Sequence, residues 1–119
     1  MSGYLLGVDW GGTRIKLGAV SAAGRMISAD VFETPVAESV EQTFQALVGR
    51  LRLIAKQQQE QTLLGIGLAL TGPTDPDRGT VLLPGKIHGL EGFPIVPRLR
   101  EVFATKGVGG KRRRGGHVR

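Results

Sequence analysis

The chain has 119 residues, no cysteine and a formal net charge of +6. This length suits one compact domain with its own core, and the lack of cysteine excludes a disulfide framework and a cysteine-based zinc site. The sequence shows no secretory signal pattern and no apolar run near the roughly 20 residues that span a membrane. We therefore expect a cytoplasmic protein without a membrane partner.

The positive charge is concentrated at one end of the chain. All ten acidic residues lie in residues 1–105, together with ten of the sixteen Lys and Arg, so this part is neutral. Residues 106–119 hold the other six basic residues and no acid. This abrupt change predicts a domain over residues 1–105, followed by a basic Gly/Arg-rich tail over residues 106–119.

Two apolar runs near the start of the chain, over residues 4–9 and 14–20, predict an antiparallel β-hairpin with a Gly-Gly turn. Around the turn stand a carboxylate, two bare backbone N–H groups, a hydroxyl and an ammonium. This set suits the phosphates of a nucleotide and their Mg²⁺. A plain hairpin turn with a capping Asp explains the same residues. The residues concerned are Asp9, Gly11, Gly12, Thr13 and Lys16.

The following elements predict the order β-β-β-α-β. Residues 25–33 alternate as a third strand, and Ser39 to Gln42 match a capping box that begins an amphipathic helix ending near Gln57. Residues 63–70 are apolar on both faces, which favours a central strand parallel to the first.

The turn-rich residues 71–76 follow this strand, at the end where α/β sheets bind ligands. Residues 80–83 then predict a short strand, residues 84–94 an irregular loop and residues 95–103 a short helix. Asp75 and Asp77 fall in turns, where Asp commonly bonds its own backbone, so a metal role is the minor interpretation. His88 falls in the loop and is interpreted as a packing or surface residue.

Three ordered segments resemble the ROK family (repressors, open reading frames, kinases) of the sugar kinase/actin-like superfamily. They are GVDWGGTRIKLGAV from Gly7, GIGLALTGPTDPDRGTVL from Gly65 and GLEGFPIVPRLREVF from Gly89. The resemblance implies an α/β fold with a mixed sheet, the N-terminal lobe of the actin-like (ribonuclease H-like) ATPase type. It implies ATP-dependent phosphorylation of a hexose, bound with the nucleotide in the cleft between this lobe and a second one.

Site residues follow from the resemblance, position by position. It implies that Asp9 serves the metal ion and that Gly72 and Gly85 border the sugar. It also implies that the phosphates of ATP are lined by Gly11, Gly12, Thr13 and Lys16.

Four positions depart from the family pattern. The residues that usually stand there are an aliphatic residue, Pro, Asn and Trp; here they are Trp10, Thr71, Lys86 and Leu90. We interpret Trp10 as a packing residue. The other departures leave the identity of the sugar open, as the sequence also leaves the donor, ATP or polyphosphate.

The family's Glu-Asn-Asp-Ala motif, whose Asp is the general base, is absent from this chain. We therefore expect no catalytic base here and no kinase activity from this chain alone. Members of full length are often homo-oligomers. Regulators of the same family are an alternative, but they carry a helix-turn-helix domain before the phosphate motif, which here begins within ten residues of Met1.

The tail KGVGGKRRRGGHVR stands where that motif is expected. As written, it could be a disordered basic arm that binds nucleic acid through phosphates. Read one base later, its codons can spell Val-Glu-Asn-Asp-Ala-Ala-Ala-Ala-Met over residues 109–117, with the Glu seven residues after Phe103. We therefore expect a change of reading frame between Ala104 and Val108, in preference to a nucleic-acid-binding arm.

Overall fold

The computed structural model describes residues 3–35, 39–70, 74–75, 80–81, 90, 92–103, 112–113 and 117–118. Two helices and eight strands lie within these residues. In chain order they are β1 (Gly3–Trp10), β2 (Arg14–Ser21), β3 (Met26–Glu33), α1 (Val40–Gln57), β4 (Thr62–Leu70), β5 (Thr74–Asp75), β6 (Thr80–Val81), α2 (Ile95–Val102), β7 (Arg112–Arg113) and β8 (His117–Val118).

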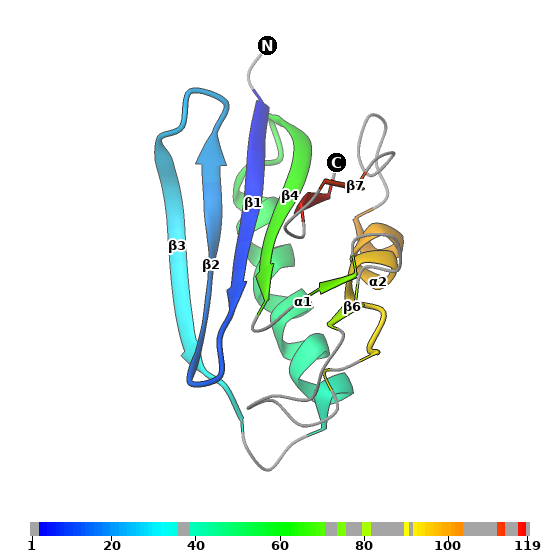
Figure 1. Ribbon diagram of the computed structural model, residues 1–119. Helices are drawn as coiled ribbons and strands as arrows, with labels where there is room; N and C mark the ends of the chain where they lie inside the picture. Colours follow the sequence, from blue (N-terminus) through cyan, green and yellow to red (C-terminus); the bar gives the residue numbers. More distant parts are fainter. Residues whose placement is uncertain are drawn as a thin grey trace.

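Six of the strands form one mixed sheet in the order β3-β2-β1-β4-β8-β7. β1 pairs antiparallel with β2, and β2 pairs antiparallel with β3, whereas β1 and β4 are parallel. The predicted order β-β-β-α-β is therefore confirmed, including the parallel strand that follows the helix. Figure 1 shows the long strands side by side with α1 crossing behind them.

The core lies between the sheet and α1. Alternate residues of β1, from Tyr4 to Trp10, are buried, as the side-chain period of a strand requires. The predicted apolar stripe of α1, from Val40 to Ile54, is buried against them. Trp10 is fully buried, which confirms its interpretation as a packing residue. The opposite face of β1 carries the intervening residues, and neither of the two described helices lies on it.

The start of α1 follows the predicted capping box. Ser39 Oγ accepts a hydrogen bond from the Gln42 N–H at 3.1 Å, and Gln42 Oε1 accepts one from the Ser39 N–H at 2.9 Å. Two N–H groups at the helix start are thereby satisfied reciprocally. This cap fixes where the chain, after leaving β3, begins to cross the sheet.

One arginine of the second helix contacts the first helix through its charge and its guanidinium face. Arg98 donates two hydrogen bonds to the Glu41 carboxylate, at 2.8 and 2.7 Å. Its guanidinium also lies 4.8 Å from the ring centroid of Phe44 and 5.4 Å from that of Phe93. Leu90, one of the departures from the family pattern, is buried in the core. The helix predicted over residues 95–103 is confirmed as α2.

Two details differ from the predictions. Thr74 and Asp75, predicted in a turn, form β5 and pair with Val81 and Thr80. A two-residue strand is too short to show a period of two, so the turn-forming residues around it concealed it. The sequence also predicts no strand in residues 106–119, yet β8 pairs antiparallel with β4 at Ile66 and Gly67. The division of the chain at residue 105 stays a prediction.

Within the described residues, neither helix is both long and apolar enough to cross a membrane.

Candidate functional site

The turn between β1 and β2 is closed by one backbone hydrogen bond. The Gly11 N–H donates to the Arg14 carbonyl oxygen at 3.0 Å. A Cβ on Gly11 would lie 2.8 Å from that same oxygen, so this closure requires a glycine. Among the described glycines, only Gly24 and Gly92 have a positive φ. Gly11 is therefore required for a close approach and not for a left-handed backbone.

This hydrogen bond changes the set of donors that the turn can offer. The sequence predicts two bare N–H groups, at Gly11 and Gly12, but the Gly11 amide is already used within the hairpin. The amides of Gly12 and Thr13 have no acceptor among the residues that the structure describes. Two backbone donors are thus available to a ligand, and they lie one residue later than predicted.

Thr34 joins the turn to the end of β3. Its Oγ1 donates a hydrogen bond to the Gly11 carbonyl oxygen at 2.8 Å, and its N–H donates to the Thr13 carbonyl oxygen at 2.9 Å. Thr34 is 8% exposed. One buried residue therefore holds the carbonyl groups on both sides of Gly12, and the sequence analysis did not identify it.

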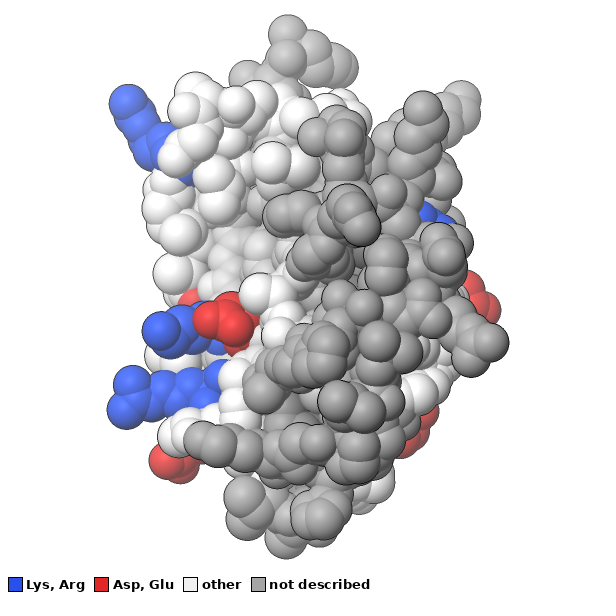
Figure 2. Space-filling model, in the orientation of Figure 1, with Lys and Arg blue, Asp and Glu red and all other residues white. Residues whose placement is uncertain are grey.

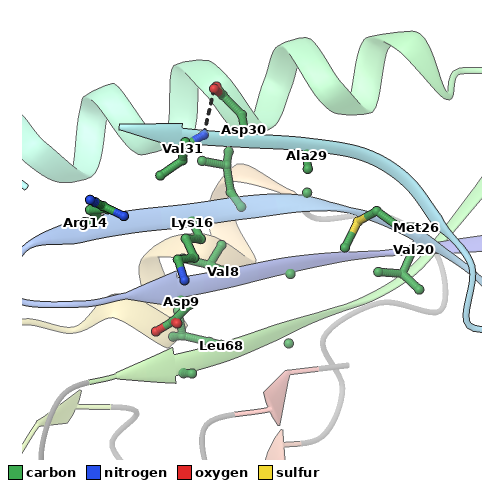
Figure 3. Close-up of a pocket in the computed structure, with 15 residues that line it drawn as sticks. Val8, Asp9, Arg14, Lys16, Val20, Met26, Ala29, Asp30, Val31 and Leu68 are labelled. Carbon is green, nitrogen blue, oxygen red and sulfur yellow. Dashed lines mark hydrogen bonds between the residues drawn. The ribbon is translucent and has the colours of Figure 1, made fainter. Parts of the chain in front are cut away.

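Asp9 and Lys16 lie directly opposite one another across the hairpin. Their strand neighbours Val8, Trp10 and Ile15 are buried beneath them, so both charged side chains project from the open face of the sheet. Both are exposed. Figure 3 shows the Asp9 carboxylate and the Lys16 ammonium on the same side of β1 and β2, with Arg14 further along β2. The predicted carboxylate and ammonium are therefore brought together beside the turn.

An open cavity of about 800 Å³ extends along this face from the charged residues. Small residues at paired positions on four neighbouring strands cross its middle, in the order Ala29, Gly18, Gly7 and Gly67. Because these side chains are so short, the face is hollowed there. Figure 2 shows charged side chains at the end of this face near the β1–β2 turn and a largely uncharged surface beyond them.

The fit to a metal ion rests on one carboxylate. Among the described residues, no group of three or more His, Asp or Glu side chains could hold a metal by itself. Mg²⁺ is commonly bound by one or two carboxylates together with water and the oxygens of a substrate's phosphates. Asp9 alone is sufficient for such a site only if phosphate oxygens complete the coordination.

The carboxylates with displaced pKa values belong to ion pairs between elements. Hydrogen bonds from Arg98 and then from Gln45 lower the pKa of Glu41 to about 2. A hydrogen bond from Arg50, at 2.8 Å, lowers the pKa of Asp30, which thereby links β3 to α1. Both shifts are explained by these contacts and do not indicate a catalytic group.

The residues predicted to border the sugar, Gly72 and Gly85, lie outside the described part of the chain, as do Asp77 and His88. Their roles stay predictions.

A comparison with models of protein families matches residues 5–107 to the ROK family. The chain belongs to this family. The comparison with curated proteins gave no match.

Solved structures similar to the chain include two ROK kinases. The ROK hexokinase from Thermus thermophilus is 31% identical, with a TM-score of 0.71 over 85% of this chain and 32% of that one. A ROK glucokinase from Streptomyces griseus, solved with glucose and AMPPNP, is 25% identical, with a TM-score of 0.70 over 85% and 30%. The chain thus spans about a third of the length of these proteins.

A ROK transcriptional regulator also shares the fold, with a TM-score of 0.71 over 86% of this chain and 26% of that one. At 11% identity this likeness concerns the fold alone. With these neighbours, the mixed sheet covered by α1 is an α/β lobe of the actin-like ATPase type, as the sequence predicts.

Proposed function

We propose that this chain is the phosphate-binding lobe of an ATP-dependent ROK hexose kinase. The observation that carries the proposal is the juxtaposition of Asp9 and Lys16 beside a turn with two available amide donors. Phosphoryl transfer requires positioning and neutralisation of charge more than covalent chemistry from the protein. A carboxylate for the metal and an ammonium for the phosphates meet that requirement from one hairpin.

The proposed roles follow from the chemistry of each group. The Lys16 ammonium, the Thr13 hydroxyl and the amides of Gly12 and Thr13 donate hydrogen bonds to phosphate oxygens. Gly11 forms the turn and lets the backbone approach. Asp9 would hold Mg²⁺, which, when bound, neutralises charge on the phosphates. Gly72 and Gly85 border the hexose in this proposal.

The comparisons favour a kinase over a regulator. The two kinases are 31% and 25% identical to this chain, whereas the regulator is 11% identical. The Streptomyces griseus glucokinase was solved with glucose and an ATP analogue. A hexose and ATP are therefore the ligands that we propose for the kinase to which this lobe corresponds.

Binding of AMPPNP with Mg²⁺ tests the proposal directly. We expect amide chemical shifts of Gly12 and Thr13 to move during an NMR titration of the 119-residue chain. Lys16→Ala is expected to weaken binding about tenfold or more, because a hydrogen bond to a charged group is worth about 1.5–3 kcal/mol. Asp9→Asn is expected to weaken binding only when Mg²⁺ is present.

Lys56→Ala is the matched control, since Lys56 is an exposed lysine in the last turn of α1. It removes the same charge from a site remote from the turn in sequence and is expected to leave the affinity within about twofold. Equal losses in Lys16→Ala and Lys56→Ala would show that the chain attracts the nucleotide by general charge and would contradict the proposal.

A further inference from the structure

We propose that Thr34 is a positioning residue that directs the amide of Gly12 toward a bound phosphate. The inference rests on the proposed function of the turn and assigns a role to a residue outside it. Thr34 lies one position beyond β3, 23 residues after Gly11, and is joined to the turn by two hydrogen bonds of 2.8 and 2.9 Å.

The argument begins with the planarity of the peptide bond. In a trans peptide the C=O and the following N–H lie in one plane and point in opposite directions, and the described residues contain no cis peptide. The Gly11 carbonyl points to the Thr34 hydroxyl. The Gly12 N–H, in the same plane, is therefore directed away from Thr34. The Thr13 carbonyl points to the Thr34 N–H, so the Arg14 N–H is directed away in the same manner.

The hydrogen bond from the Thr34 hydroxyl matters because Gly12 does little to restrict rotation of the peptide plane that precedes it. A glycine without a Cβ permits the neighbouring peptide planes to turn over at little steric cost. If the peptide plane between Gly11 and Gly12 turned over, the Gly11 carbonyl oxygen would face the phosphates. The Gly12 N–H would then point away from them. The hydrogen bond from Thr34 Oγ1 opposes this rotation. A donor that is fixed before the ligand arrives needs no reorganisation when charge approaches.

Three features restrain the conformation of Thr34. The next residue is Pro35, and a proline confines the residue before it to extended conformations. The side chain is buried. Glu33, the preceding residue, pairs with Arg14 at the end of the β2–β3 ladder. These restraints limit the directions in which the two donors of Thr34 can point.

A purely structural role is the competing explanation, in which Thr34 only ties the hairpin to β3. Three variants separate the two. Thr34→Val keeps the shape and the backbone bond but removes the hydroxyl, whereas Thr34→Ser restores the hydroxyl. Thr43→Val is the matched control, since Thr43 is also buried and its Oγ1 donates to the Ser39 carbonyl at 3.2 Å, at the start of α1.

The first measurement needs no ligand. Residual dipolar couplings report the direction of each N–H bond in the 119-residue chain. We expect Thr34→Val to change the couplings of Gly12 beyond those of the rest of β1 and β2, while Thr34→Ser and Thr43→Val leave them as in the wild type. Unchanged Gly12 couplings in a folded Thr34→Val protein would overturn the proposal.

The second measurement is binding of tripolyphosphate with Mg²⁺, a probe that carries the phosphates alone. Thr34→Val is expected to weaken binding about tenfold, the equivalent of one hydrogen bond, with affinity recovered in Thr34→Ser and intact in Thr43→Val. Equal losses in Thr34→Val and Thr43→Val would mean that lower stability explains the effect, and would overturn the proposal. A wild-type chain that does not bind the probe would contradict the proposed function, and the couplings would still decide whether Thr34 orients the plane.

Discussion

At the scale of single residues, the two glycines Gly7 and Gly11 make a direct comparison. A Cβ on Gly11 would lie 2.8 Å from the Arg14 carbonyl oxygen, whereas a Cβ on Gly7 would meet nothing within 4 Å. Both residues lie on the same hairpin, but only Gly11 is needed to close it. Gly11 is therefore required to close the turn, independently of any role in binding a ligand.

The free energy of unfolding should reflect this difference. Gly11→Ala is expected to lower it by about 1–3 kcal/mol, the usual cost of an overpacked site. Gly7→Ala should leave it within about 0.5 kcal/mol or raise it slightly, since alanine loses less conformational entropy on folding. Urea titrations followed by circular dichroism measure both. Equal destabilisation by the two substitutions would contradict the geometry described for the turn.

At the residue scale, the sequence places Asp9 and Lys16 around one turn, because two apolar runs joined by a short turn predict a hairpin. The structure adds that they lie opposite one another, and their roles stay predictions. The hydrogen bonds of Thr34 to the turn could not be predicted, because they depend on how β3 pairs with β2 and bring together residues 23 positions apart. The Gly11 amide, which the sequence indicated as free, is used by the hydrogen bond to the Arg14 carbonyl oxygen that closes the turn.

At the scale of elements, α1 was predicted in detail. Its cap is a four-residue pattern and its buried stripe has the helical period, so both signals lie within the helix itself. β5 gave no such signal, because two residues cannot display a period. Contacts between elements depend on tertiary packing and leave no such local pattern in the sequence. The contact of Arg98 with Glu41 and two aromatic rings is an example.

The link between α1 and α2 should weaken in acid. Glu41 has a pKa lowered from 4.5 to about 2 by its hydrogen bonds with Arg98 and Gln45. A carboxylate with a depressed pKa stabilises the folded state above its unfolded pKa and loses that effect as pH falls toward the folded value. We therefore expect wild type to have a higher Tm than Glu41→Gln at pH 7, and the gap to close between pH 4.5 and 2.

The Arg98→Ala background provides the control for this effect. Without the guanidinium, Glu41→Gln is expected to change Tm by much the same amount at every pH, since the main cause of the pKa shift is removed. Because Glu41 and Arg98 are partly exposed, added salt should reduce the gap as well. A gap in Tm that stays constant from pH 7 to 2 in the wild-type background would contradict this account.

At the scale of the whole molecule, the main question is the segment after α2. The match to the ROK family ends at residue 107, within the interval of residues 104–108 where we expect the reading frame to change. This coincidence supports the proposal that residues 106–119 do not continue the kinase lobe.

This proposal predicts the behaviour of the purified chain. With the expected general base outside it, the 119-residue protein should give no hexose-dependent turnover of ATP in a coupled assay, even if AMPPNP binds.

Sequencing the gene through codons 104–108 and beyond should reveal the Glu-Asn-Asp codons one base out of frame. Turnover by this chain, or an unshifted frame without a kinase lobe downstream, would refute the proposal.

The outer strand of the sheet has a further consequence for solubility. Among the described strands, β3 has a single neighbour, β2, so its other edge presents unpaired backbone groups that could pair with another chain. Met26 and Val31 add exposed apolar surface along it. Asp30 and Glu33 place carboxylates on the same strand, and the shift in register opposite Val20 makes it irregular. Because charged side chains on an edge strand disfavour pairing with another chain, we expect variants of the lobe without these acids to aggregate more readily.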